Sequence, residues 1–184
     1  MKFLPQVIPE IILIKPTLLG DDRGYFAETF RQDLFNSAIG GNINFIQENE
    51  SKSSKGVLRG LHYQVAPFSQ SKLLTVIQGA VIDVVVDIRK SSLTFGQHLS
   101  FELTADNKHQ LFVPKGFAHG FVVLSDIAIF NYKVDSYYAP KYERGIAYND
   151  QDLKINWQLK PEILKLSNKD LNNPTLANVK DLFD

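Results

Sequence analysis

The residues of this chain best suited to chemistry stand in two short motifs, RGLHYQ at 59–64 and PKGFAHGF at 114–121. Each places a histidine close to a glycine within a β-like run, and together they hold two of the four histidines. An imidazole both binds metals and carries protons near neutral pH. If the fold brings His62 and His119 together, the motifs indicate either a metal site or a site for proton transfer.

A metal site needs more ligands than these motifs supply. Barrel proteins that bind metal typically combine a His-x-His pair with a carboxylate, because such cations require several nitrogen or oxygen ligands. The second position after His62 is Gln64, and His119 adds only one further nitrogen. The chain has no cysteine, which excludes thiolate ligands. We therefore expect no metal, and the pattern favours proton transfer.

Three further side chains suit such chemistry, and each also has an ordinary structural interpretation. Lys72 starts an apolar strand, where it is either exposed or turned inward to stabilise negative charge on an oxygen. Tyr132 alternates with core residues, and it either packs among them or acts as a general acid. Asp170 lies three residues after Ser167, which is the spacing of a helix capping box. Alternatively, its carboxylate orients an imidazole.

Two polar segments each have two interpretations, as solvent-exposed surface or as part of a ligand-binding site. Arg23 follows a turn-prone acidic pair and is either a solvated strand residue or a guanidinium that binds phosphate or carboxylate oxygens. The run QENES at 47–51 is either a solvent-facing loop or a set of amides that recognise hydroxyls or a base edge. Arg59 and His62 would face opposite sides of a regular strand, unless a bulge at Gly60 realigns them.

Length and composition indicate one soluble domain. The 184 residues, 44% of them hydrophobic, suffice for a single domain over 1–184 with its own core. Lys+Arg and Asp+Glu number 20 each, so we expect no nucleic acid or membrane partner. The absence of cysteine fits a reducing compartment. The first residues lack the pattern of a signal peptide, and no apolar stretch reaches membrane-spanning length. We expect a cytoplasmic protein.

The pattern of short apolar runs between turn residues predicts a mainly β fold. Alternation places Ile82, Val84 and Val86 on one face of the segment 80–89, which predicts a half-buried strand. The other predicted strands are 11–14, 72–77, 98–103, 110–113, 120–124 and 128–134. Helices are predicted only at 33–39 and over the tail, 169–183. Many closely spaced strands favour an antiparallel sandwich or barrel.

Six blocks along the chain resemble the dTDP-4-dehydrorhamnose 3,5-epimerase family, enzymes of deoxysugar nucleotide synthesis. The blocks are DDRGYFAETF (21–30), QENESKSSKGVLRGLHYQ (47–64), GAVIDVVVDIRKSSLTFG (79–96), PKGFAHGF (114–121), YKVDSYYAP (132–140) and ERGIAYNDQDLKINW (143–157). The resemblance implies a mainly β fold, a jelly-roll (cupin-type) antiparallel β-barrel with short peripheral helices. It also implies a homodimer with an active site inside each barrel.

The resemblance further implies a role for each candidate residue. His62 would remove carbon-bound protons and Asp170 would polarise it. Tyr132 would return protons from the opposite face, and Lys72 would lie beside the sugar C4 oxygen. The residues that match nucleotide- or sugar-contacting positions are Arg23, Glu28, Gln47, Asn49, Arg59, His119, Tyr138, Glu143 and Lys169. The first two of these belong to an N-terminal strand segment that such dimers exchange.

The implied reaction inverts C3 and C5 of dTDP-4-keto-6-deoxy-D-glucose and gives dTDP-4-keto-L-rhamnose, in dTDP-L-rhamnose biosynthesis. Both carbons flank the C4 carbonyl, so removal of either proton yields an enolate. The lysine charge at the C4 oxygen favours that enolate. Inversion needs an acid on the face opposite the base. No net redox change occurs, so we expect no cofactor.

Several alternatives stay open at this point. A single-site epimerase would act at C3 or C5 of a related dTDP-4-keto sugar, because small pocket changes decide which carbon reaches the base. A non-catalytic cupin that binds a sugar nucleotide would tolerate loss of His62, Tyr132 or Asp170, and all three are present. A 3,4-ketoisomerase would carry a histidine where this chain has Gln64. A metal-dependent cupin oxygenase is tested by metal analysis of the purified protein.

Overall fold

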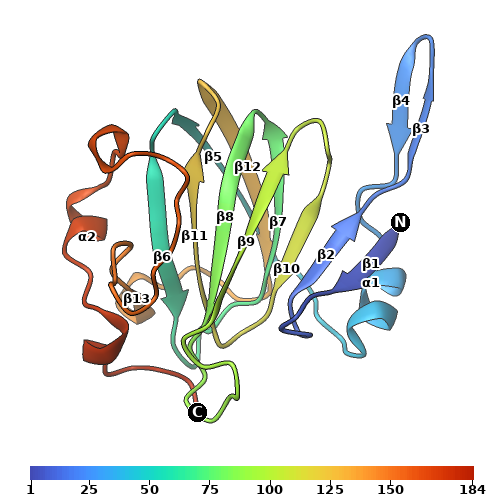
Figure 1. Cartoon of the computed structure of the whole chain (residues 1–184). Helices are drawn as coiled ribbons and strands as arrows, with labels where there is room; N and C mark the ends of the chain where they lie inside the picture. The colour runs from blue at the N-terminus through green and yellow to red at the C-terminus, as the bar shows by residue number, and fades with distance from the viewer.

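Two antiparallel sheets face each other in the computed structural model, which describes all 184 residues (Figure 1). The six-stranded sheet consists of β1 (Lys2–Pro5), β2 (Ile12–Lys15), β10 (Gln110–Val113), β7 (Lys72–Gln78), β12 (Ile127–Val134) and β5 (Gln47–Ser54). The five-stranded sheet consists of β13 (Glu143–Gly145), β6 (Leu58–Gln64), β11 (Phe117–Val123), β8 (Ala80–Asp87) and β9 (His98–Thr104). The prediction of a mainly β, antiparallel fold is confirmed.

The remaining elements lie around these two sheets. A separate hairpin, β3 (Leu18–Asp21) and β4 (Gly24–Ala27), projects away from the sheets next to α1 (Gln32–Ile39) (Figure 1). On the opposite side lies the short helix α2 (Asn168–Leu171). Three 3-10 turns span Pro140–Tyr142, Pro161–Ile163 and Leu176–Asn178. No helix combines the length and the apolar character needed to cross a membrane.

The strand β8 is buried on both faces, which corrects the prediction that it is half-buried. Val81 and Val85 belong to the core between the two sheets. Ile82 and Val84 point the other way, into a second apolar cluster that includes residues of the C-terminal segment, such as Leu176. That segment covers the outer face of the five-stranded sheet, so the face that alternation assigned to the core is the outer one.

The tail does not form the helix predicted over 169–183, and that prediction is wrong. The helix α2 ends at Leu171, and Pro174 follows shortly after, where its ring disfavours helical continuation. Beyond it the chain is irregular apart from the 3-10 turn Leu176–Asn178, and its apolar side chains pack against the second cluster. The Tyr63 hydroxyl donates to the Asp181 carbonyl at 2.9 Å, which holds the tail on β6.

The polar run at 47–51 is part of the strand β5, so its interpretation as a loop is wrong. The burial of β5 alternates, with Gln47, Asn49 and Ser51 partly buried and the residues between them exposed. These inward positions line cavities rather than the apolar core. The sequence lacked the apolar alternation of a strand because this strand presents polar groups on its inner face.

The two histidine motifs meet because two glycines let their strands approach closely. In the pairing of β6 with β11, His62 lies opposite His119, and the register then shifts. A Cβ atom on Gly60 would lie 2.5 Å from Gly120 Cα, and one on Gly120 would lie 2.8 Å from the Arg59 carbonyl oxygen. Gly60 also has φ +129°, a conformation that favours glycine. The irregularity predicted at Gly60 is therefore present.

Candidate active site

A cavity of about 560 Å³ lies beside the paired histidines. It receives side chains from both sheets and from the segment that leads into α2. Seven of the predicted site residues line it: Arg59, His62, Lys72, His119, Tyr132, Lys169 and Asp170. The register shift next to Gly60 brings Arg59 and His62 to the same cavity. The fold thus assembles groups that stand up to 111 positions apart in the chain, from Arg59 to Asp170.

His62 and Asp170 form a close pair, with His62 Nε2 2.5 Å from Asp170 Oδ1. An ionised carboxylate only accepts hydrogen bonds, so the proton of this contact belongs to Nε2. The other ring nitrogen, Nδ1, then has a free lone pair and lies 4.0 Å from Glu143 Oε1. After Nδ1 takes up a proton, the imidazolium would stand between two carboxylates.

Asp170 also takes part in the cap of α2, so both interpretations of this residue hold. The Asp170 backbone N–H donates to Ser167 Oγ at 3.1 Å, and Ser167 Oγ donates to Asp170 Oδ2 at 2.8 Å. Burial raises the pKa of the Asp170 carboxyl, but the hydrogen bonds from His62 and Ser167 outweigh it and the net pKa is lowered. The short helix therefore holds an ionised carboxylate against the imidazole.

Lys72 and Tyr132 approach the cavity from adjacent strands, β7 and β12. The only hydrogen bond of the Lys72 ammonium is with the His62 carbonyl oxygen, at 3.5 Å. Burial lowers the pKa of Lys72 to about 8, against the opposing effect of nearby carboxylates. Burial likewise raises the pKa of Tyr132, so its phenol keeps its proton at neutral pH. The cavity thus contains a buried lysine and a neutral phenol near His62.

A smaller cavity of about 260 Å³ adjoins the first at Tyr132, which lines both. Its lining contains four further predicted residues: Gln47, Asn49, Tyr138 and Glu143. Glu143 accepts from the Tyr138 hydroxyl at 2.6 Å and forms an ion pair with Lys169 at 2.5 Å. The hydrogen bond to Glu143 raises the pKa of Tyr138 to about 12. This chain of three polar groups lies where the two cavities meet.

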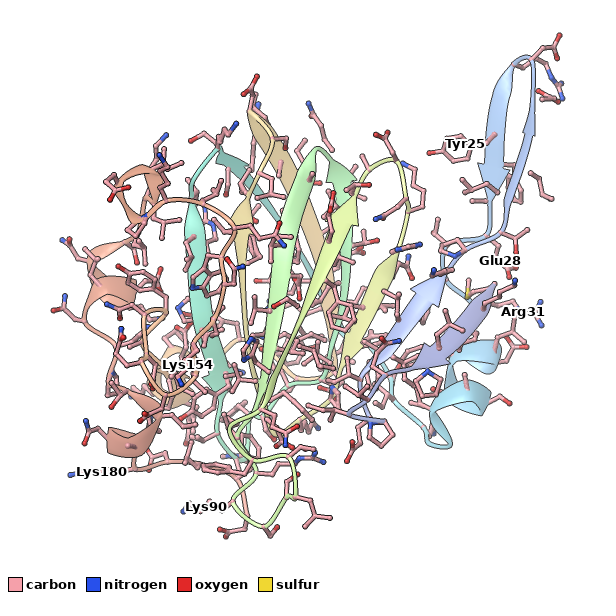
Figure 2. All side chains as sticks on the ribbon, in the orientation of Figure 1. Tyr25, Glu28, Arg31, Lys90, Lys154 and Lys180 are labelled. Carbon is pink, nitrogen blue, oxygen red and sulfur yellow. The ribbon has the colours of Figure 1, made fainter.

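Arg23 and Glu28 lie apart from both cavities. Arg23 stands in the turn of the β3–β4 hairpin and forms an ion pair with Asp21. Figure 2 shows Tyr25 and Glu28 on this arm, which extends from the side of the molecule opposite α2. Within one chain, these two predicted contact residues do not reach the groups around His62.

The model of the dTDP-4-dehydrorhamnose 3,5-epimerase family matches residues 5–178, which is most of the chain. The chain belongs to this family. A curated dTDP-4-dehydrorhamnose 3,5-epimerase from Shigella flexneri is 48% identical over 94% of each chain. The 3,5-epimerase family resemblance inferred from the six sequence blocks is thereby confirmed.

Solved structures of 3,5-epimerases have the same fold. The dTDP-4-dehydrorhamnose 3,5-epimerase from Elizabethkingia anophelis NUHP1 superposes with a TM-score of 0.94, at 45% identity over 98% of each chain. A dTDP-6-deoxy-D-glucose-3,5-epimerase from Legionella pneumophila Philadelphia 1, in complex with dTDP-4-keto-L-rhamnose, gives 0.93 at 44% identity over 97% of this chain and 94% of that one. The cupin-type jelly-roll fold predicted from the sequence is confirmed.

One acidic residue next to the lining of the cavity was not predicted from the sequence. Asp83 on β8 is fully buried, and its Oδ2 lies 2.8 Å from His119 Nε2. The signal in the sequence was its position two residues from Val81 and from Val85, both of which face the core. Alternation puts Asp83 on the face opposite Ile82 and Val84, and that face is the inner one.

Proposed function

We propose that this protein inverts C3 and C5 of dTDP-4-keto-6-deoxy-D-glucose, with His62, Lys72, Tyr132 and Asp170 as its proton-transfer groups. The observation that carries the proposal is the 2.5 Å contact between His62 and Asp170, beside a lysine and a protonated tyrosine in one cavity. A base that is oriented by a carboxylate is the arrangement needed to remove a weakly acidic C–H proton.

The reaction at each carbon proceeds in two steps. His62 Nδ1 takes the proton from C3 or C5, and the electron pair of the broken C–H bond moves onto the C4 oxygen as an enolate. The Lys72 ammonium stabilises that oxygen. Tyr132 then donates its proton to the opposite face of the same carbon, and the C4 carbonyl re-forms. His62 then releases its proton to solvent, and the Tyr132 oxygen takes one up from solvent.

The remaining polar groups fit the nucleotide and phosphate parts of the substrate. Arg59 and Lys169 line the larger cavity, where their charges suit a diphosphate. Gln47 and Tyr138 line the smaller one, where an amide and a ring suit a base. A substrate that spans both cavities would pass Tyr132, with its sugar beside His62 and its nucleotide beyond.

A homodimer with exchanged arms would complete the site. The β3–β4 hairpin pairs with no other strand, and an isolated hairpin is marginally stable in water. Leu19, Tyr25 and Phe26 are exposed on it, so it presents apolar surface for a second copy. In such a dimer, Arg23 and Glu28 would reach the partner's cavity, where the Arg23 guanidinium would add a positive charge for the diphosphate.

Hydrogen exchange tests the activity directly. The protein is incubated with dTDP-4-keto-6-deoxyglucose in deuterated water, and C3 and C5 are followed by NMR. We expect deuterium and inversion at both carbons. Exchange at one carbon only would select the single-site alternative, and exchange at neither would overturn the catalytic proposal in favour of a binding protein.

A mixing experiment tests the exchanged arm. Arg23→Ala keeps the cavity but loses the arm's guanidinium, whereas His62→Asn keeps the arm but loses the base. Each variant alone is expected to be nearly inactive. After unfolding and refolding together, the mixture should regain about a quarter of wild-type activity, because half of the dimers are mixed and each has one complete site. No recovery in a mixture that forms dimers would contradict arm exchange.

A further inference from the structure

The strand β8 carries two fully buried carboxylates, Asp83 and Asp87, with very different surroundings. Asp87 accepts hydrogen bonds from the side chains of Arg89, Ser92 and Thr94, so both of its oxygens have partners. Asp83 has one contact, between its Oδ2 and His119 Nε2, and its Oδ1 has no partner in the protein. An unpartnered buried carboxylate oxygen destabilises a fold, so its presence calls for a functional explanation.

The negative charge of Asp83 acts on the Lys72 ammonium. Lys72 extends into the same interior from β7, and it has no carboxylate within 4.0 Å and only the weak contact to the His62 carbonyl. The titratable groups whose charges act on the Lys72 ammonium are Asp83 from β8 and Glu143 from β13. The other ionisable residues of the cavity are Arg59, His62, His119, Tyr132, Lys165, Lys169 and Asp170. Of the two carboxylates whose charges act on Lys72, Asp83 is the one that is fully buried.

We propose that Asp83 is a positioning residue of the active site, which fixes the protonation of His119 and keeps Lys72 charged. This inference rests on the proposed function, because it concerns the lysine that stabilises the enolate. Asp83 does not touch the substrate in this proposal and acts through the two residues that do.

The first consequence concerns His119. Since a carboxylate only accepts, the proton of the contact with Asp83 belongs to His119 Nε2. Burial lowers the pKa of His119, although Asp83 opposes the effect, so the ring is neutral. A neutral ring that is protonated at Nε2 has an unprotonated Nδ1, and this atom has no partner in the protein. His119 therefore acts as an acceptor, which selects a substrate hydroxyl rather than a phosphate oxygen.

The second consequence concerns Lys72. Its pKa of about 8 already lies close to neutral because of burial, and the charge of Asp83 opposes a further decrease. Without that charge the ammonium would lose its proton at lower pH. The enolate oxygen would then lose its cation at a pH where the wild-type enzyme still has it. The activity of the protein should therefore fall as the pH rises through the Lys72 pKa. Without Asp83, this fall should begin at a lower pH.

The test compares Asp83→Asn with Asp87→Asn, a control at a second buried carboxylate of the same strand. In Asp83→Asn, the alkaline limb of kcat for C3 and C5 exchange should move down by about one pH unit. The rate at pH 8 should fall about fivefold, because the charged fraction of Lys72 drops from about a half to about a tenth, with a much smaller loss at pH 6. Asp87→Asn should lower the melting temperature without moving the limb. An unmoved limb in Asp83→Asn, or an equal shift in both variants, would overturn the proposal.

Two NMR measurements separate this inference from the proposed activity. In protein labelled with 13C-lysine, the titration midpoint of Lys72 should be lower in Asp83→Asn than in the wild type, whichever reaction the protein catalyses. An unchanged midpoint would contradict the role of Asp83. In wild-type protein labelled with 15N-histidine, His119 should be neutral and protonated at Nε2. A proton on Nδ1 would overturn the assignment even if Asp83→Asn does not fold.

Discussion

The barrel contains two histidine–aspartate pairs, and their surroundings differ sharply. His62 and Asp170 come from a strand and a short C-terminal helix, 108 positions apart, and 25% of the His62 side chain is exposed. His119 and Asp83 come from neighbouring strands of one sheet, with exposures of 7% and 0%. The first pair is open to the cavity and to exchange with water. The second is enclosed by the sheet.

This difference in exposure suits His62 to gaining and losing a proton during the reaction, and His119 to staying neutral. A base must gain and lose a proton in each turnover, so it needs access to solvent and a partner that orients its ring. His62 meets both requirements, with Asp170 on one side and Glu143 on the other. His119 is held neutral by burial, which suits it to recognition. The same two residue types therefore support different tasks because the sheet exposes one pair and covers the other.

The largest expected effect is the loss of the base. His62→Asn should lower kcat for exchange at both carbons by about 10³-fold, within the range for a lost general base. The matched change at the enclosed pair, His119→Asn, should mainly raise KM. Steady-state kinetics of the two variants measures this contrast. If His119→Asn lost as much kcat as His62→Asn, the division of tasks between the pairs would be wrong.

The next effect concerns the acid that serves the open pair. Tyr132→Phe should lower the rate of inversion by about 10²-fold, because no proton is delivered to the opposite face. Removal of protons by His62 should continue, so deuterium should enter C3 and C5 without inversion. NMR distinguishes incorporation from inversion in one sample. Loss of both at the same rate would mean that Tyr132 does not act separately from the base.

A smaller effect is expected from the cap that holds Asp170 in place. Ser167→Ala removes the hydrogen bonds to the Asp170 N–H and carboxylate, and it should lower the free energy of unfolding by about 1 kcal/mol. The activity should fall several-fold as Asp170 becomes less well ordered. Ser92→Ala, which removes a hydrogen bond to Asp87 instead, provides a control. A loss of stability with full activity would show that the pair does not depend on the helix cap.

The smallest effect is a change in acid stability. The pKa of Asp170 lies below its ordinary value of 3.8, so its stabilising contribution is present above that value and is lost as the pH falls through the folded-state pKa. Asp170→Asn should therefore unfold with a weaker dependence on pH in this range. Melting temperatures measured on either side of 3.8 test this, and an unchanged slope would contradict a favourable contact with His62.

The sequence predicted the strands more reliably than the faces they present. The strand at 110–113 has the predicted bounds, because turn residues limit it on both sides. In β8, however, only the face of Ile82, Val84 and Val86 was expected to be buried, whereas that face is the outer one and the face of Asp83 lies inside. An enzyme places polar groups inside its barrel, so hydrophobic alternation alone does not identify the inner face.

The site residues that belong to recognisable sequence motifs were predictable. The contacts that only the tertiary fold creates were not. The contact between His62 and Asp170 was inferred through the family resemblance, because no local pattern links residues so far apart. The helix predicted for the tail was wrong, since the tail after Pro174 is irregular and packs its apolar side chains against the second apolar cluster. Asp83 was missed for a related reason, since its partner His119 lies on another strand.

The close contact of Gly60 and Gly120 sets the distance between the two histidine-bearing strands by main-chain atoms alone. Side-chain changes elsewhere in the barrel leave that spacing unaltered. The inner positions of β5, an edge strand of the other sheet, can therefore be varied to accept different sugar nucleotides without moving His62 relative to His119. The barrel is thus a scaffold in which substrate range and catalytic geometry can evolve separately.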